Sequence, residues 1–237
     1  MSQQATIVLV HGFWGGAAHW SRVILELRRQ GHTAIRAVEL PLTSLADDAE
    51  RTRKMVAQID GPVLLVGHSY GGAVISAAAN GQPNVKSLVY VAAFAPDQGE
   101  TALELSGRYP GGTLGGALAE PVPLADGGKD FYIQQDKFHK QFAADVPKAE
   151  ADLMAVAQRP IAEAALTEAA GAPAWKNVPS YFVYGTADKN IPAAALGFMA
   201  ERANSRKTVA IPGASHVVMT SHPAAVAKLI EEAAQAK

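Results

Sequence analysis

A serine stands in a glycine-flanked turn at residues 67–71, Gly-His-Ser-Tyr-Gly. The turn follows an all-apolar run at 63–66 and precedes a run of small residues at 71–79. This G-x-S-x-G pattern, between a predicted strand and a predicted helix, is typical of a sharp turn that lifts a serine hydroxyl above a sheet edge. A serine hydroxyl is a weak nucleophile and needs a base that is held by a third group. Ser69 is therefore the candidate nucleophile.

An acid and a histidine follow two later predicted strands. Asp188 lies in the first of these loops and His216 in the second. Because parallel strands bring their carboxyl ends to one edge of a sheet, we expect both side chains at the same edge as Ser69. Asp97, after an earlier strand, is the alternative acid, and His222 is the alternative base. The order of serine, acid and histidine predicts a catalytic triad.

Acyl transfer also needs hydrogen-bond donors for a developing oxyanion. The backbone N–H of Tyr70 directly follows the candidate nucleophile. The backbone N–H of Phe13 lies in a glycine-rich turn after the first predicted strand. Donors at these two positions are typical of serine hydrolysis on such a sheet, and one donor contributes about 10²–10³ in rate.

Strands and helices alternate along most of the chain. Short apolar runs predict six strands, at residues 7–10, 33–38, 63–66, 85–92, 180–184 and 208–211. Helical spacing follows most of them, with proline near the first turn of the helices that begin at about Pro192 and Pro223. This alternation predicts an α/β fold, a mostly parallel six-stranded sheet with helices on both faces.

Residues 95–177 interrupt the alternation. They open with a loop rich in glycine and proline and then show helical patterns at 147–158 and 161–170. A connection of this length is too long for a plain crossover between two strands. We expect one structural domain, in which 1–94 and 178–237 form the core and 95–177 form a lid over the carboxyl edge of the sheet.

Composition excludes several function classes. The 237 residues include 21 Lys and Arg against 22 Asp and Glu, a net charge of −1, which offers no basic surface for nucleic acid or an anionic membrane. The absence of cysteine excludes disulfides, thiolate catalysis and cysteine-bound metal. No histidine cluster has metal-ligand spacing, so we expect no metal. Without a signal-like start or an apolar run of about 18–20 residues, we expect no membrane segment and a cytoplasmic protein.

With these residues in place, the sequence resembles an α/β-hydrolase over nearly its whole length. The resemblance is most specific at residues 67–72, 185–192 and 213–219. The last two segments are similar to the branch that holds plant methyl-esterases and hydroxynitrile lyases. The resemblance implies a Ser69–Asp188–His216 triad, a small helical lid and no cofactor. It predicts a carboxylesterase that acts on a small-molecule ester, as a monomer or homodimer.

Two positions tend to separate the chemistries of that branch. The lyases carry a threonine after the first-strand histidine and a lysine after the catalytic histidine. This sequence has Gly12 and Val217 at those positions. Without a cation beside the base to stabilise departing cyanide, the resemblance favours ester hydrolysis.

Apolar and aromatic side chains are expected to line the substrate pocket. Its wall is expected to include Phe13, Trp14, Tyr70 and Val217, and the lid aromatics that are candidates to cover it are Phe131, Tyr132, Phe138, Phe142 and Trp175. Such a wall predicts a small hydrophobic or aromatic ester. Two other functions stay open on the same fold. One is a ligand receptor with slow or no turnover, and the other is a cofactor-free dioxygenase that relies on the His–Asp pair more than on the serine. Replacement of Ser69 by alanine separates the latter from hydrolysis.

Overall fold

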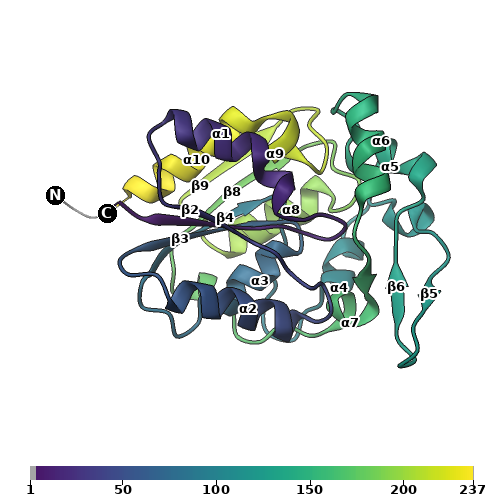
Figure 1. Ribbon diagram of the computed structural model, residues 1–237, viewed down its shortest axis with the longest axis horizontal. Helices are drawn as coiled ribbons and strands as arrows, with labels where there is room; N and C mark the ends of the chain where they lie inside the picture. The colour runs from purple at the N-terminus through teal and green to yellow at the C-terminus, as the bar shows by residue number, and fades with distance from the viewer. Residues whose placement is uncertain (1–3, 237) are drawn as a thin grey trace.

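A six-stranded parallel sheet forms the centre of the protein (Figure 1). The computed structural model describes residues 4–236, and its main sheet has the order β2-β1-β3-β4-β8-β9. Every neighbouring pair is parallel, which confirms the predicted sheet. The strands are β1 (Thr6–Val10), β2 (Ile35–Val38), β3 (Val63–His68), β4 (Val85–Val91), β8 (Ser180–Gly185) and β9 (Lys207–Ile211).

The strand order places two important turns side by side. The chain runs from β1 outward to β2 and then returns to β3 on the other side of β1. β1 and β3 are in register, with Val10 opposite Gly67, so both strands end at the same level. Such a reversal of strand order opens a crevice at the carboxyl edge of a parallel sheet. The glycine-rich turn after β1 and the serine turn after β3 therefore leave the sheet as neighbours.

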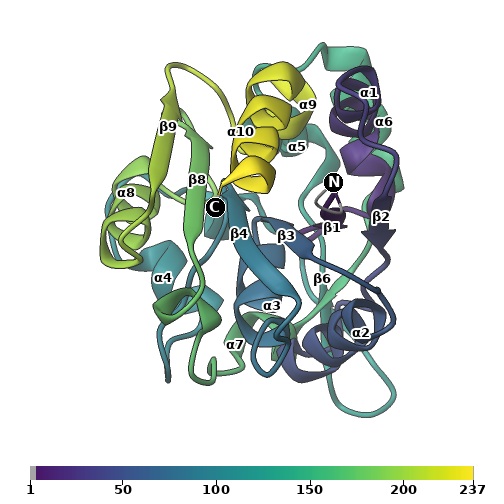
Figure 2. The same ribbon diagram turned by 90° about the vertical axis from the view of Figure 1, so that its left-hand side faces the viewer.

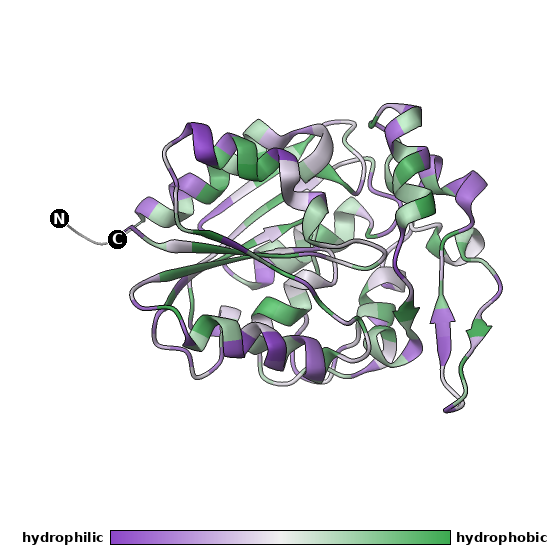
Figure 3. Cartoon of the chain, in the orientation of Figure 1, coloured by the Kyte–Doolittle hydropathy of each residue, from purple (hydrophilic) through white to green (hydrophobic). Residues whose placement is uncertain are grey.

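Helices cover both faces of the sheet. Figure 2 shows α1 (Ser21–Arg29) and α10 (Pro223–Gln235) on one face, and α2 (Leu45–Ala57) and α3 (Gly71–Ala78) on the other. Hydrophobic residues colour the strands in Figure 3, and hydrophilic ones gather on outward helix surfaces. α3 packs closely because its residues are small: a Cβ on Gly72 would collide with the carbonyl oxygen of Phe94. Two further helices follow the last strands, α8 (Ala193–Arg202) and the short α9 (Val218–Ser221).

Residues 95–177 contain both helices and a small antiparallel sheet. The predicted helix at 147–158 is confirmed as α6. The helix expected at 161–170 is wrong at both ends, because residues 161–162 form a strand and the helix itself spans only residues 163–167. Strands of two or three residues are too short to show an alternating pattern in the sequence. Helices α5 and α6 and strands β5 and β6 lie beyond the carboxyl ends of the main strands (Figure 1). The elements are α4 (Ala102–Gly107), η2 (Leu114–Ala117), β5 (Val122–Pro123), β6 (Lys129–Phe131), α5 (Gln135–Phe142), α6 (Lys148–Ala157), β7 (Ile161–Ala162), α7 (Glu163–Thr167) and η3 (Ala174–Lys176).

Two kinds of feature are absent from residues 4–236. None of the helices in that range combines the length and the apolar character that a membrane span requires. Nor do three or more histidine or acidic side chains in that range come close enough together to hold a metal ion.

Candidate active site

Ser69 occupies a tight turn between β3 and α3. Its φ of 54° lies in the left-handed region, which costs a non-glycine residue about 1–2 kcal/mol. Close contacts on both sides fix this turn. A Cβ on Gly67 would collide with the carbonyl oxygen of Gly71, and a Cβ on Gly71 would lie 2.5 Å from the carbonyl oxygen of Val10. The glycines of the motif are therefore required by space, and the turn presents the serine at the end of the sheet.

The structure joins Ser69, His216 and Asp188 in one hydrogen-bonded chain. The Ser69 Oγ lies 2.8 Å from the His216 Nε2, and the His216 Nδ1 lies 2.6 Å from the Asp188 Oδ2. The other carboxylate oxygen, Asp188 Oδ1, accepts the N–H groups of Asn190 and Ile191 at 2.8 and 2.9 Å. An ionised carboxylate only accepts, so the Nδ1 of His216 carries the ring proton. The Nε2 is then free to take a proton from Ser69.

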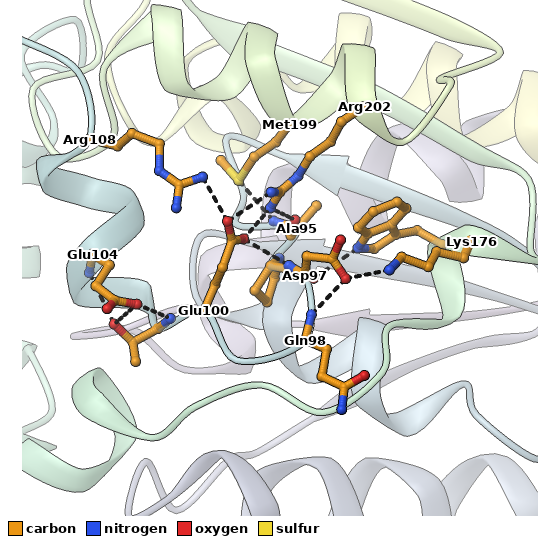
Figure 4. A network of polar contacts seen from close by, with 12 residues as sticks. Ala95, Asp97, Gln98, Glu100, Glu104, Arg108, Lys176, Met199 and Arg202 are labelled. Atoms are coloured by element: carbon orange, nitrogen blue, oxygen red, sulfur yellow. Dashed lines mark hydrogen bonds and ion pairs between the residues drawn. The ribbon is translucent and has the colours of Figure 1, made fainter.

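The alternative acid and base lie outside this chain. Asp97 forms an ion pair with Lys176 at 2.5 Å, in a polar network that also holds Glu100 and Arg202 (Figure 4). The hydrogen bond from Lys176 lowers the pKa of Asp97. His222 bonds to the Ser221 hydroxyl at 2.9 Å. Neither Asp97 nor His222 has a hydrogen bond to a member of the Ser–His–Asp chain in the part of the protein that the structure describes.

Phe13 and Tyr70 lie against each other beside Ser69. Their rings stack with centroids 4.2 Å apart and planes inclined by 14°. Trp14 has a φ of 59°, so the turn after β1 bends sharply at this point. Among residues 4–236 the N–H groups of Phe13 and Tyr70 donate to no acceptor in the protein. Both predicted oxyanion donors therefore have an N–H group that is available to a ligand.

Gly12 is in van der Waals contact with the serine turn. A Cβ at this position would lie 2.5 Å from the Cβ of Ser69 and 2.8 Å from the carbonyl oxygen of His68. Real Cβ atoms essentially never come this close to another heavy atom. Any side chain at this position would therefore require the serine turn to shift.

Phe142 links the ring of His216 to other aromatic side chains. The ring of Phe142, on α5, lies 5.2 Å from the imidazole, and it also contacts the rings of Trp14 at 6.0 Å and Phe138 at 4.8 Å. The indole of Trp14 donates to the carbonyl oxygen of Phe131 at 3.1 Å, which links the turn after β1 to the 95–177 segment. Val217 follows His216 and is fully buried. Ser69 itself is only 3% exposed, so the site is closed in this structure.

Two of the aromatic residues expected to cover the site, Phe142 and Trp175, lie in different environments. Phe142 lies beside His216, and its spacing of four from Phe138 puts both rings on one face of α5. Trp175 lies in a different environment, where its indole donates to the carbonyl oxygen of Pro96 at 3.0 Å and its ring packs under Arg202. No local pattern in the sequence separates the two residues, since both are aromatic and lie in the same inserted segment.

Further histidines surround the site and are held neutral. Burial lowers the pKa of His68 well below its ordinary value, and its Nε2 donates to the carbonyl oxygen of His216 at 3.0 Å. Burial also lowers the pKa of His11, and it lowers that of His19 to about 4. The Nε2 of His11 accepts the N–H of Leu40 at 3.0 Å. Near neutral pH these three rings add no positive charge beside the Ser–His–Asp chain.

A model of the alpha/beta hydrolase family matches residues 7–229. The chain belongs to this family. Its sequence is 30% identical to a carbendazim hydrolyzing esterase of Nocardioides sp. (strain SG-4G) over 146 residues, or 50% of this chain and 60% of that protein. It is 34% identical to methylesterase 7 of Arabidopsis thaliana over 111 residues, or 40% of this chain and 42% of that protein. The matches thus span only about half of the length of these relatives.

A crystal structure of polyneuridine aldehyde esterase has the same fold. It superposes with a TM-score of 0.82 over 97% of this chain and 99% of the other, at 21% sequence identity. The predicted resemblance to the α/β-hydrolases, and to the branch that includes plant methylesterases, is confirmed by these matches.

Proposed function

We propose that this protein is a serine esterase that hydrolyses small hydrophobic or aromatic carboxylic esters. The observation that carries the proposal is the hydrogen-bonded chain Ser69–His216–Asp188, buried at the carboxyl edge of the sheet. Family membership and the relatives named as esterases support the same reaction.

The reaction proceeds through an acyl-enzyme. His216 accepts the Ser69 proton at Nε2 as the Ser69 Oγ bonds to the ester carbonyl carbon. The tetrahedral oxyanion accepts hydrogen bonds from the N–H groups of Phe13 and Tyr70. His216 then returns the proton to the leaving alcohol, and the acyl group stays on Ser69. Water, deprotonated by His216, attacks the acyl carbonyl, and His216 returns that proton to the Ser69 Oγ as the bond to the acid breaks.

Asp188 holds His216 in the tautomer that this reaction needs. Its carboxylate accepts the Nδ1 proton and stabilises the imidazolium that forms during each step. The two backbone N–H groups that bind its other oxygen fix the carboxylate in place. Since both side chains are completely buried, this interaction is shielded from solvent.

The enclosure favours apolar substrates. The Phe142 ring packs against His216 and is itself in contact with the rings of Trp14 and Phe138, and Val217 is buried next to His216. A wall of this kind binds hydrophobic or aromatic groups well and a charged group poorly. Gly12 and Val217 stand where the lyases of the resembled branch carry threonine and lysine, which supports ester hydrolysis over cyanohydrin cleavage.

Residues 95–177 act as a lid in this proposal. Phe138 and Phe142 come from α5 of this segment, and Ser69 is almost fully covered. Substrate entry therefore requires part of the segment to move. The hydrogen bond from the Trp14 indole to the Phe131 carbonyl oxygen is one contact that such an opening would stretch or break.

Steady-state hydrolysis of p-nitrophenyl acetate and butyrate tests the proposal. Wild type should turn over both esters, and Ser69→Ala should lose at least about 10³-fold in kcat/KM. Circular dichroism of both proteins checks that the variant is folded. An inert wild type, or a variant as active as wild type, would overturn the proposal and direct attention to ligand binding and to oxygen consumption.

A further inference from the structure

Asp48 is a buried carboxylate that no step of the proposed reaction uses. It lies on α2 and is fully shielded from solvent. Its Oδ2 accepts the Tyr70 hydroxyl at 2.8 Å, and its Oδ1 accepts the N–H of Leu42 at 3.0 Å. No basic side chain among residues 4–236 forms an ion pair with it within 4.0 Å. Burial of a carboxylate without an ion-pair partner destabilises the folded state, and an apolar residue at this position would stabilise it more.

Asp48 controls the side chain of Tyr70. Burial and the nearby charge of Asp48 raise the pKa of Tyr70 well above its ordinary value, so the hydroxyl keeps its proton and donates it to the carboxylate. The ring is then held at two places, by Asp48 at the hydroxyl and by the stacked Phe13 ring at its face. Tyr70 therefore has one orientation, set from α2.

The Phe13 ring stacks on Tyr70 and meets Trp14 edge-on. Phe13 lies in the turn after β1, between Gly12 and the left-handed Trp14. The N–H of Phe13 makes no hydrogen bond within the described residues that would fix it. Its buried side chain is the contact that joins this turn to the residue after Ser69.

We propose that Asp48 is a positioning residue for oxyanion binding: it orients Tyr70, whose ring fixes Phe13, so that both backbone N–H groups face the reacting carbonyl. This inference rests on the proposed esterase function. Asp48 touches no reacting atom and acts through Tyr70. Donors held in place in advance stabilise charge that develops in the transition state, and a misplacement of about 1 Å can cost about 10²-fold in rate.

Tyr70→Phe and Asp48→Asn test the proposal, with Tyr90→Phe as the matched control. Tyr90 is also fully buried, stacks on a phenylalanine (Phe182, 4.5 Å) and bonds through its hydroxyl to a single side chain (Ser76, 2.7 Å). It lies on β4 and has no role in the reaction. Each variant is compared with wild type in thermal midpoint, kcat and KM for p-nitrophenyl butyrate.

Tyr70→Phe should lower kcat by about 10-fold or more with KM changed by less than about 3-fold, because the loss falls on the transition state. Asp48→Asn keeps the shape but offers one acceptor for two donors, so kcat should fall by about 3–10-fold. Tyr90→Phe should keep kcat within about 2-fold of wild type even where its thermal midpoint falls. Because Asp48 acts through Tyr70, the kcat of the Asp48→Asn/Tyr70→Phe double variant should lie within about 2-fold of the kcat of Tyr70→Phe.

Affinity for a trifluoromethyl ketone gives a second readout. Ser69 adds to the ketone carbon and forms an oxyanion that both N–H groups bind, so the inhibition constant should rise in parallel with the loss of kcat/KM. Equal kcat losses in Tyr70→Phe and Tyr90→Phe, additive effects in the double variant, or unchanged ketone affinity would overturn the positioning role. If Tyr70→Phe does not fold, Asp48→Asn tests the positioning role without it, and an unchanged kcat in that variant would overturn the role. Ser69→Ala distinguishes failure of the positioning role from failure of the esterase proposal, since full activity in that variant contradicts the esterase function itself.

Discussion

Replacement of Asp188 by asparagine should nearly abolish turnover while the fold is kept. Two backbone N–H groups, of Asn190 and Ile191, point at Oδ1 from 2.8 and 2.9 Å, so the amide oxygen of the new side chain must face them. Its NH₂ group then faces the Nδ1 of His216 at about the present 2.6 Å. Because that group donates, the ring proton must move to Nε2.

The tautomer change removes the base. With the proton on Nε2, His216 donates toward the Ser69 Oγ and has no lone pair there to accept its proton. The same change in a serine protease lowers kcat about 10⁴-fold, and each tenfold loss equals about 1.4 kcal/mol in the activation free energy. We expect a loss of about 10³–10⁴ in kcat, or on the order of 5 kcal/mol, with little change in KM.

The assay is steady-state hydrolysis of p-nitrophenyl acetate by wild type, Asp188→Asn and Asp97→Asn. The Asp97 variant is the control because that carboxylate pairs with Lys176 outside the Ser–His–Asp chain. It should keep kcat within about 2-fold of wild type. Full activity in Asp188→Asn, or a large loss in Asp97→Asn alone, would refute the reasoning.

Gly12→Ala should lower kcat at least about 10²-fold, because the new Cβ would lie 2.5 Å from the Cβ of Ser69. Steady-state ester hydrolysis tests this, with circular dichroism to check that the variant is folded. Phe142→Ala removes a fully buried ring beside His216, so the free energy of unfolding in urea should fall by about 3–5 kcal/mol and kcat/KM for butyrate should rise relative to acetate. Burial and, less strongly, the charge of Asp47 raise the pKa of Asp48 from 3.8 to about 6. Hydrogen bonds from Tyr70 and Leu42 and the charge of Arg159 act in the opposite direction but are outweighed. The native state therefore binds the proton more tightly, and wild type should lose on the order of 3 kcal/mol of stability relative to Asp48→Asn as pH rises from about 4 to 7. Urea unfolding of both proteins at the two pH values measures this, and an equal pH dependence would contradict it.

Most of the main sheet and the candidate triad could be predicted from the sequence. The six strands are short apolar runs between turn residues, and parallel strands leave one consistent arrangement of their carboxyl ends. That edge is enough to bring Ser69, Asp188 and His216 toward one another, although they are far apart in the chain. The distances and the choice of Asp188 over Asp97 as the hydrogen-bond partner of His216 required the structure.

The inserted segment was less predictable. Strands β5 to β7 have two or three residues each, and their pairing depends on contacts between distant segments that no local pattern records. The same holds for Phe142 and Trp175, two aromatic residues whose environments differ only because the segment folds back on the sheet. Asp48 has the sequence context of an ordinary helical acid, and only its burial against Tyr70 distinguishes it.

Covalent labelling tests the central claim most directly, that Ser69 is the nucleophile. A fluorophosphonate carries an electrophilic phosphorus that a reactive serine attacks, with loss of fluoride, and His216 is placed to accept the serine proton. Mass spectrometry of the labelled protein should find one adduct, on the peptide that contains Ser69, together with loss of esterase activity. Ser69→Ala should remain unlabelled. An adduct on another residue, or an esterase that stays active and unlabelled, would contradict the account.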